Sequence, residues 1–204
     1  MRVDDYRNAI TLAAKDLAAR DPKRTAELSG AVLGPEYLTL TFMNRPVKIA
    51  LDGYTVSWAD HAEEFALTDA VLVLHYLQGA KNLEPAGELT AYRQIPGGEF
   101  YTAAFRKRAE LPLISVFGRR PGLLTQASST LGGVAKTALG DEAFLFRVLP
   151  QAEIAVILHY GDEEFEPDGQ VLFDRNMRLC FNIEDLAWLG SALVYRLMNA
   201  ARRL

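Results

Sequence analysis

A glycine-containing turn flanked by arginines is the strongest candidate for chemistry in this sequence. Gly97 and Gly98 follow Pro96 where a helix is expected to begin, with Arg93 before the turn and Arg106 after it. The first turn of a helix presents unpaired N–H groups at the positive end of the helix dipole, and glycine lets a ligand approach closely. The turn therefore predicts an anion-binding pocket. The alternative is a tight turn that needs glycine for a positive φ.

Three more residues extend this candidate pocket. Arg108 is the alternative to Arg106 as a second cation, and Tyr101 ends the glycine turn. His75 lies on an apolar helix, on the least apolar stripe of that helix, which also carries Gln78. Such a stripe could line the pocket, so His75 is expected near the bound anion. The alternative is a hydrogen-bonded histidine in the core.

A second candidate combines a histidine with a run of carboxylates. His159 ends an expected strand, and Asp162, Glu163 and Glu164 follow in the next turn. Histidine and carboxylates together bind divalent metal ions, or hold a histidine protonated for acid–base catalysis. The pattern predicts a metal site there. The alternative is an acidic surface turn with one salt-bridged histidine.

The motifs of several common enzyme classes do not occur. The sequence has no GxGxxG, GxSxG or HExxH motif. Leu131–Thr137 is similar to a phosphate-binding loop, but Ala135 stands where that loop needs a glycine directly before Lys136. The acidic run 162–173 has Pro167 at the sixth position, where a calcium-binding EF-hand loop needs glycine.

Hydrophobic periodicity and turn residues predict the elements that position these residues. Helices are expected first in residues 1–20, then after Asp21 and Pro22, and a three-stranded meander follows from Tyr37 to Trp58. Further helices are expected at 70–80, 99–108, 113–117, 121–131 and, capped by Asn182, at the end of the chain. Further strands are expected at 89–95, 143–149, 153–160 and 170–173.

The strands occur in clusters and do not alternate regularly with helices, which predicts an α+β fold. We find no linker or repeat and expect one domain over residues 1–204, with antiparallel strand clusters packed against a central buried helix and the long C-terminal helix. The periodicity predicts one shared core containing Leu72, Val73, Leu74, Leu77, Ile154, Val156, Leu158, Leu189, Leu193 and Leu197.

The composition narrows the function classes. Half of the residues are hydrophobic, no apolar run is long enough to span a membrane, and the first residues do not resemble a secretory signal, so a cytoplasmic location without a membrane partner is expected. The single cysteine, Cys180, excludes an intrachain disulfide and a Cys-x-x-Cys zinc site. The net charge of −4 argues against nucleic acid as a partner.

Six short motifs together resemble a domain-of-unknown-function family found mainly in anaerobic bacteria and archaea. The motifs are Leu74-His75-Tyr76-Leu77, Pro96-Gly97-Gly98 with Tyr101 and Phe105, Leu131-Gly132-Gly133, Gly161-Asp162-Glu163-Glu164-Phe165, Leu172-Phe173-Asp174 and Glu184-Asp185. The resemblance covers roughly residues 60–190 and implies an anaerobic setting. Some similar proteins carry a cysteine-rich iron–sulfur segment of the kind seen beside corrinoid proteins. This chain, with its one cysteine, cannot build such a cluster.

These observations favour a binding module for an anionic small molecule or cofactor, accessory to anaerobic one-carbon or corrinoid-linked metabolism. Its expected site comprises Arg93, Gly97, Gly98, Tyr101 and His75. The first alternative is a metal-dependent enzyme built on His159 and the following carboxylates, and the second is a protein-interaction domain. The sequence identifies neither a cofactor nor a catalytic residue.

Overall fold

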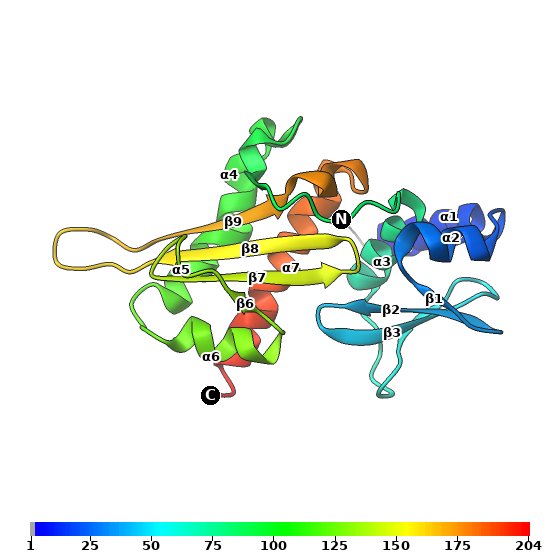
Figure 1. Ribbon diagram of the computed structural model, residues 1–204, viewed down its shortest axis with the longest axis horizontal. Coiled ribbons are helices and arrows are strands. Elements are labelled where there is room, and N and C mark those ends of the chain that lie inside the picture. The colour runs from blue at the N-terminus through cyan, green and yellow to red at the C-terminus, as the bar shows by residue number, and fades with distance from the viewer. Residues whose placement is uncertain (1–2) are drawn as a thin grey trace. The chain divides into compact units, whose positions relative to one another are not determined.

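The computed structural model describes residues 3–204 and divides the chain into two compact units (Figure 1). Unit 1 contains the described residues up to Glu84 and the segments Leu149–Gln151 and Leu179–Phe181. Unit 2 contains the segments Pro85–Val148, Ala152–Arg178 and Asn182–Leu204. Helices and antiparallel sheets confirm the α+β class. The expectation of one domain depends on how the two units associate, and it stays a prediction.

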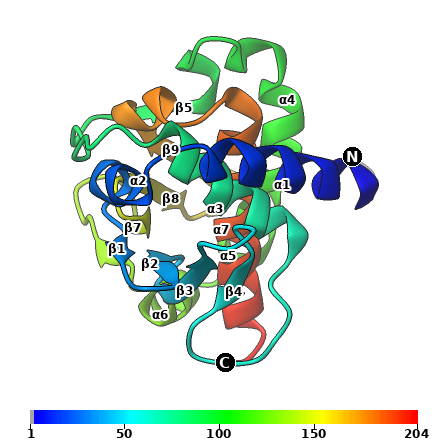
Figure 2. The same cartoon turned by 90° about the vertical axis from the view of Figure 1, so that its right-hand side faces the viewer.

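Unit 1 contains three helices. They are α1 (Val3–Ala18), α2 (Pro22–Ser29) and α3 (Leu67–Gly79), and both α1 and α2 contact α3 (Figure 2). The expected cap of α2 is confirmed, because the side chain of Asp21 accepts a hydrogen bond from the N–H of Lys23. Residues 1 and 2 of the first expected helix lie outside the described residues.

A four-stranded antiparallel sheet completes unit 1. Its strands, in spatial order, are β1 (Val32–Leu33), β2 (Tyr37–Phe42), β3 (Arg45–Ala50) and β4 (Val56–Trp58). Met43 and Asn44 both have positive φ and form the two-residue turn between β2 and β3. Strand β3 therefore begins directly after this turn, at Arg45.

Unit 2 is organised around a five-stranded sheet. The strand order is β5 (Leu89–Ala91), β9 (Asp168–Asp174), β8 (Ala152–His159), β7 (Glu142–Leu149) and β6 (Val134–Ala135). Helix α7 (Ile183–Ala201) packs on one face, where a Cβ on Gly190 would lie 3.0 Å from the ring of Phe173. Figure 1 shows α5 (Leu111–Phe117) and α7 behind this sheet. The opposite face is crossed by the loop after β6.

The connection from β5 to α5 differs from the prediction. The expected strand 89–95 ends at Ala91 because the side chain of Gln94 accepts a hydrogen bond from the Ala91 N–H and closes a turn. The expected helix 99–108 is instead a series of short helical elements that runs directly into α5. These are η2 (Gly98–Phe100), α4 (Thr102–Phe105) and the π-helix η3 (Arg106–Glu110), while η1 (Tyr92–Gln94) occupies the end of the expected strand.

The remaining elements agree more closely with the sequence. They are α6 (Leu123–Thr130) and α7, whose expected cap is confirmed by the bond from the Asp185 N–H to the side chain of Asn182. The short helix η4 (Arg175–Leu179) was not predicted. All the expected core positions are buried, those at 72–77 in unit 1 and those at 154–158 and 189–197 in unit 2. Among residues 3–204, no helix combines the length and apolar character needed to cross a membrane.

Candidate anion-binding site

The glycine turn is a structural feature of unit 2. Gly97 has a φ of +87°, in the left-handed region that favours glycine. Gly98 is buried, and a Cβ placed on it would lie 2.0 Å from the carbonyl oxygen of Tyr92. The turn itself therefore requires both glycines.

The expected cradle of free N–H groups is wrong at Gly98. The Gly98 N–H donates to the carbonyl oxygen of Ile95 at 2.8 Å, and η2 is only three residues long. Tyr101 ends this turn with an exposed side chain. Pro96 lines a cavity separate from that of Arg93 and Arg106. An anion at these arginines would therefore be bound by their side chains, without the Gly98 amide.

Arg93 and Arg106 line the same cavity of about 290 Å³ in unit 2. This cavity, here named the arginine pocket, is lined by Ala91, Tyr92, Arg93, Thr102, Phe105, Arg106, Glu110, Asp168, Gln170 and Leu172. Arg108 does not line it, since its guanidinium lies over the ring of Trp188, 4.6 Å from the ring centroid. The structure thus selects Arg106 as the partner of Arg93.

Two stacked aromatic rings form the apolar part of the arginine pocket. The rings of Tyr92 and Phe105 lie 4.4 Å apart between centroids and are inclined by 20°. The Tyr92 hydroxyl donates to the carbonyl oxygen of Ile183, and burial raises the pKa of Tyr92. The Tyr92 side chain is therefore uncharged and held in place, and it forms a wall of the pocket that does not repel an anion.

The two arginines differ in their ion pairs. Arg106 lies 3.4 Å from a carboxylate oxygen of Glu110 and 3.5 Å from one of Asp168. Arg93 is exposed and has no ion pair within the part of the chain that the structure describes. A guanidinium group presents its donors in a planar fork that matches a carboxylate or phosphate. Arg93 is therefore the group in this pocket most available to an anion.

Glu110 is a pocket residue that sequence reasoning missed. Its side chain is 16% exposed, and it accepts a hydrogen bond at 3.5 Å from the N–H of Val171, in a part of β9 that β5 does not reach. Burial raises the pKa of Glu110 and so favours its neutral form. The sequence gives one indication of this residue, since Glu110 is the single acid in the basic run 106–120. That indication does not reveal its contact with β9.

His75 belongs to α3 in unit 1, whereas Arg93, Gly97, Gly98 and Tyr101 belong to unit 2. It is half-buried and takes part in an interaction within the protein. Its expected position beside the bound anion therefore stays a prediction.

The acidic turn after β8 does not gather its side chains into a metal site. Asp162 accepts hydrogen bonds from the N–H groups of Glu164 and Phe165, at 2.8 and 2.7 Å. These bonds, the one from Phe165 first, hold the pKa of Asp162 below its ordinary value. Within residues 3–204, no group of three or more His, Cys, Asp or Glu residues is placed to hold a metal ion. The metal site predicted at His159, Asp162, Glu163 and Glu164 is therefore not supported among the described residues, and two backbone N–H groups already bind one oxygen of Asp162.

Residues 21–196 match the model of a protein family described as Domain of unknown function (DUF3786). The chain belongs to this family. The resemblance to a domain-of-unknown-function family is thus confirmed, while its motifs and anaerobic distribution stay predictions. No curated protein and no solved structure matches the chain. The arginine pocket lies wholly within the part that defines the DUF3786 domain.

Proposed function

We propose that this DUF3786 domain binds a small anionic molecule in the arginine pocket. The observation that supports this most directly is that Arg93, which has no ion pair within residues 3–204, lines the same cavity as Arg106. The cavity volume of about 290 Å³ lies just below the range of roughly 300–1,000 Å³ that is typical of small-molecule sites, so the ligand is compact.

Each part of the pocket has a role in this proposal. The Arg93 guanidinium binds the anionic group, and Arg106 adds a second positive charge, shared with Glu110 and Asp168. The stacked ring of Phe105 contacts the apolar part of the ligand. Because burial favours the neutral form of Glu110, that residue opposes the anion less than an exposed carboxylate would.

The proposal is tested by titrating the purified protein with inorganic phosphate, sulfate and a series of small mono- and dicarboxylates in a calorimeter. Arg93→Gln should weaken the tightest of these about 10-fold or more, the effect of losing one charge-assisted hydrogen bond of about 1.5–3 kcal/mol. Arg120→Gln is the matched control, because Arg120 is also exposed in unit 2 but does not line the pocket. Equal losses in both variants, or no binding of any anion, would exclude the site.

The wider context and one alternative also remain proposals. An accessory role in anaerobic one-carbon or corrinoid-linked metabolism rests on the family resemblance alone. A protein-interaction domain is favoured by one observation, the adjacent side chains of Phe100 and Tyr101, which are 81% and 53% exposed. An interaction site there predicts that Phe100→Ser abolishes binding to a partner while leaving the anion titration unchanged.

A further inference from the structure

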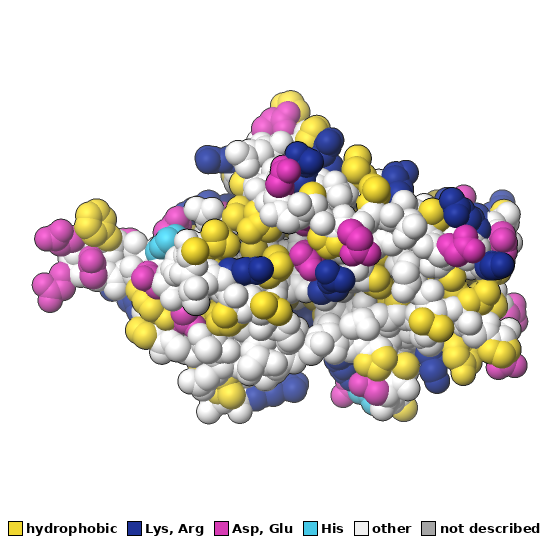
Figure 3. Space-filling view, in the orientation of Figure 1, with side chains coloured by type: hydrophobic (Ala, Val, Ile, Leu, Met, Phe, Trp, Pro, Cys, Tyr) yellow, Lys and Arg dark blue, Asp and Glu magenta, His cyan; other side chains and the backbone are white. Residues whose placement is uncertain are grey.

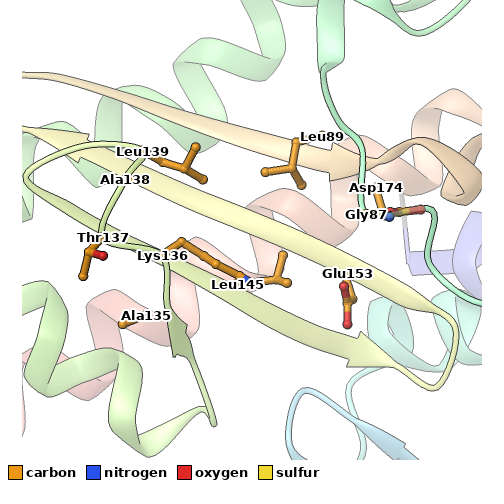
Figure 4. Close-up of a pocket in the computed structure, with 10 residues that line it drawn as sticks. All are labelled: Gly87, Leu89, Ala135, Lys136, Thr137, Ala138, Leu139, Leu145, Glu153 and Asp174. Carbon is orange, nitrogen blue, oxygen red and sulfur yellow. The ribbon is translucent and has the colours of Figure 1, made fainter.

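We propose that unit 2 contains a second ligand site, for an amphipathic organic molecule with one anionic group such as a carboxylate. The site is a cavity of about 590 Å³ on the sheet face crossed by the loop after β6, here named the loop pocket (Figure 4). It is lined by Gly87, Leu89, Ala135, Lys136, Thr137, Ala138, Leu139, Leu145, Glu153 and Asp174. None of these residues lines the arginine pocket, so the two proposals are independent.

The loop that covers this site is anchored at both ends. The N–H of Lys136 donates to the carbonyl oxygen of Ala143 at 2.8 Å, and the N–H of Asp141 donates to that of Leu158 at 3.0 Å. Between them, Gly140 lies against β8 so closely that a Cβ on it would be 2.8 Å from a side-chain carbon of Ile157. The pocket is therefore formed before any ligand arrives, which lowers the entropic cost of binding.

The walls of the loop pocket favour an apolar ligand body. Leu89 of β5, Leu145 of β7 and Leu139 of the loop come from separate segments and surround the cavity (Figure 4). Hydrophobic side chains gather over β7–β9 on this face, with basic and acidic side chains among them (Figure 3). The volume is within the range of sites for small organic molecules, which are mostly lined by apolar groups with a few polar ones.

The charges of the pocket favour an anionic head group. Glu153 is paired with Arg147, whose two nitrogens lie 2.9 and 3.1 Å from one carboxylate oxygen. Asp174 is 1% exposed and accepts hydrogen bonds from three backbone N–H groups, at 2.8–3.0 Å. Lys136 has no ion pair within residues 3–204. The oxygens of Asp174 are therefore satisfied by the backbone and Glu153 is paired with Arg147, which leaves Lys136 as the charged side chain of the lining available to a ligand.

The site can be tested with a fluorescent amphipathic anion, 8-anilinonaphthalene-1-sulfonate, and its uncharged analogue N-phenyl-1-naphthylamine. The folded full chain should bind one molecule of the sulfonate, and decanoate should displace it. Lys136→Gln should weaken the sulfonate about 10-fold and leave the uncharged analogue unchanged. Ala138→Trp, at an exposed position of the loop, should fill the cavity and abolish binding of both probes.

Two control variants show whether a loss of binding is specific to the loop pocket. Lys107→Gln removes an exposed lysine of unit 2 that does not line the pocket, and should leave the affinity unchanged. Arg93→Gln should also have no effect, because that residue belongs to the arginine pocket. Equal sulfonate affinity in the wild type, Lys136→Gln and Ala138→Trp would overturn the proposal, as would the absence of binding to the folded wild-type protein.

Discussion

The arginine pocket and the acidic turn both contain several charged side chains, but these side chains are paired differently in the two regions. In the pocket, segments far apart in the sequence bring their side chains to one cavity and leave Arg93 without an ion pair within the described residues. In the turn, the side chain of Asp162 accepts hydrogen bonds from the N–H groups of Glu164 and Phe165, and Glu166 forms an ion pair with Arg119 at 2.7 Å. Charges that are neighbours in sequence are therefore weaker evidence for a site than charges that converge from distant segments.

The largest effect is expected at the glycine turn beside the pocket. Gly98→Val should lower the free energy of unfolding by about 3 kcal/mol, because the new side chain would collide with the backbone at Tyr92. Urea denaturation measures this change. Gly97→Ala is the control and should cost only about 1 kcal/mol, since its Cβ meets no atom closer than 4.0 Å and the cost is that of a positive φ. A Gly98→Val protein of wild-type stability would contradict the structural role of the turn.

A smaller, pH-dependent effect should distinguish the carboxylate of the pocket from those of the turn. The folded protein holds the Glu110 proton more tightly than the unfolded chain, because burial raises its pKa. Ionisation of Glu110 therefore favours the unfolded chain. Its contribution to the free energy of unfolding falls as the pH rises from the unfolded-state pKa through the folded-state pKa. Glu110→Gln should lose less stability between pH 4 and pH 7 than the wild type does, as measured by urea denaturation at both values.

The control for this experiment is Glu163→Gln, which neutralises an exposed carboxylate of the acidic turn. In this variant, the free energy of unfolding should change between pH 4 and pH 7 by the same amount as in the wild type. If Glu110→Gln behaves like this control, Glu110 is not held in its neutral form by burial, and its part in the anion proposal fails.

The smallest effect is expected at Asp162. Its pKa is lowered by hydrogen bonds to the ionised carboxylate, so it stabilises the fold above its unfolded pKa, and that contribution is lost as the pH falls through the folded pKa. Asp162→Asn should therefore lower Tm slightly at pH 7 and not at low pH. Adding Mg²⁺ or Mn²⁺ should leave Tm unchanged in both proteins. A rise in the wild type that the variant lacks would restore the metal site.

The sequence predicted features that depend on neighbouring residues. The cap of α2 at Asp21 and the cap of α7 at Asn182 are local hydrogen bonds with clear residue preferences, and both were found. The end of β5 at Ala91 was missed, because the apolar and aromatic residues that follow it are equally compatible with a strand.

The candidate site was also predicted only in part, because local sequence patterns do not show which distant segments meet at it. Arg93 and Arg106 were identified from their positions around the glycine turn, and they do line one cavity. Asp168 and Gln170 could not be assigned to it, because they reach the cavity through the pairing of β9 with β8 and no local pattern connects them to Arg93. Glu110 depends in addition on a π-helix, for which the sequence has no comparable signature.

That π-helix makes the arginine pocket depend on chain length as well as on residue type. In η3 the N–H of Leu111 bonds to the carbonyl oxygen of Arg106, five residues earlier, and Pro112 follows with no N–H to offer. Removing one residue, such as Lys107, would allow a regular α-helix there, whose register changes by about 100° per residue. Arg106 and Glu110 would then be an i,i+3 pair, which still shares one face of an α-helix but with a different spacing along and around the axis. A single-codon deletion should thus change the shape of the pocket while leaving every residue that lines it in the sequence.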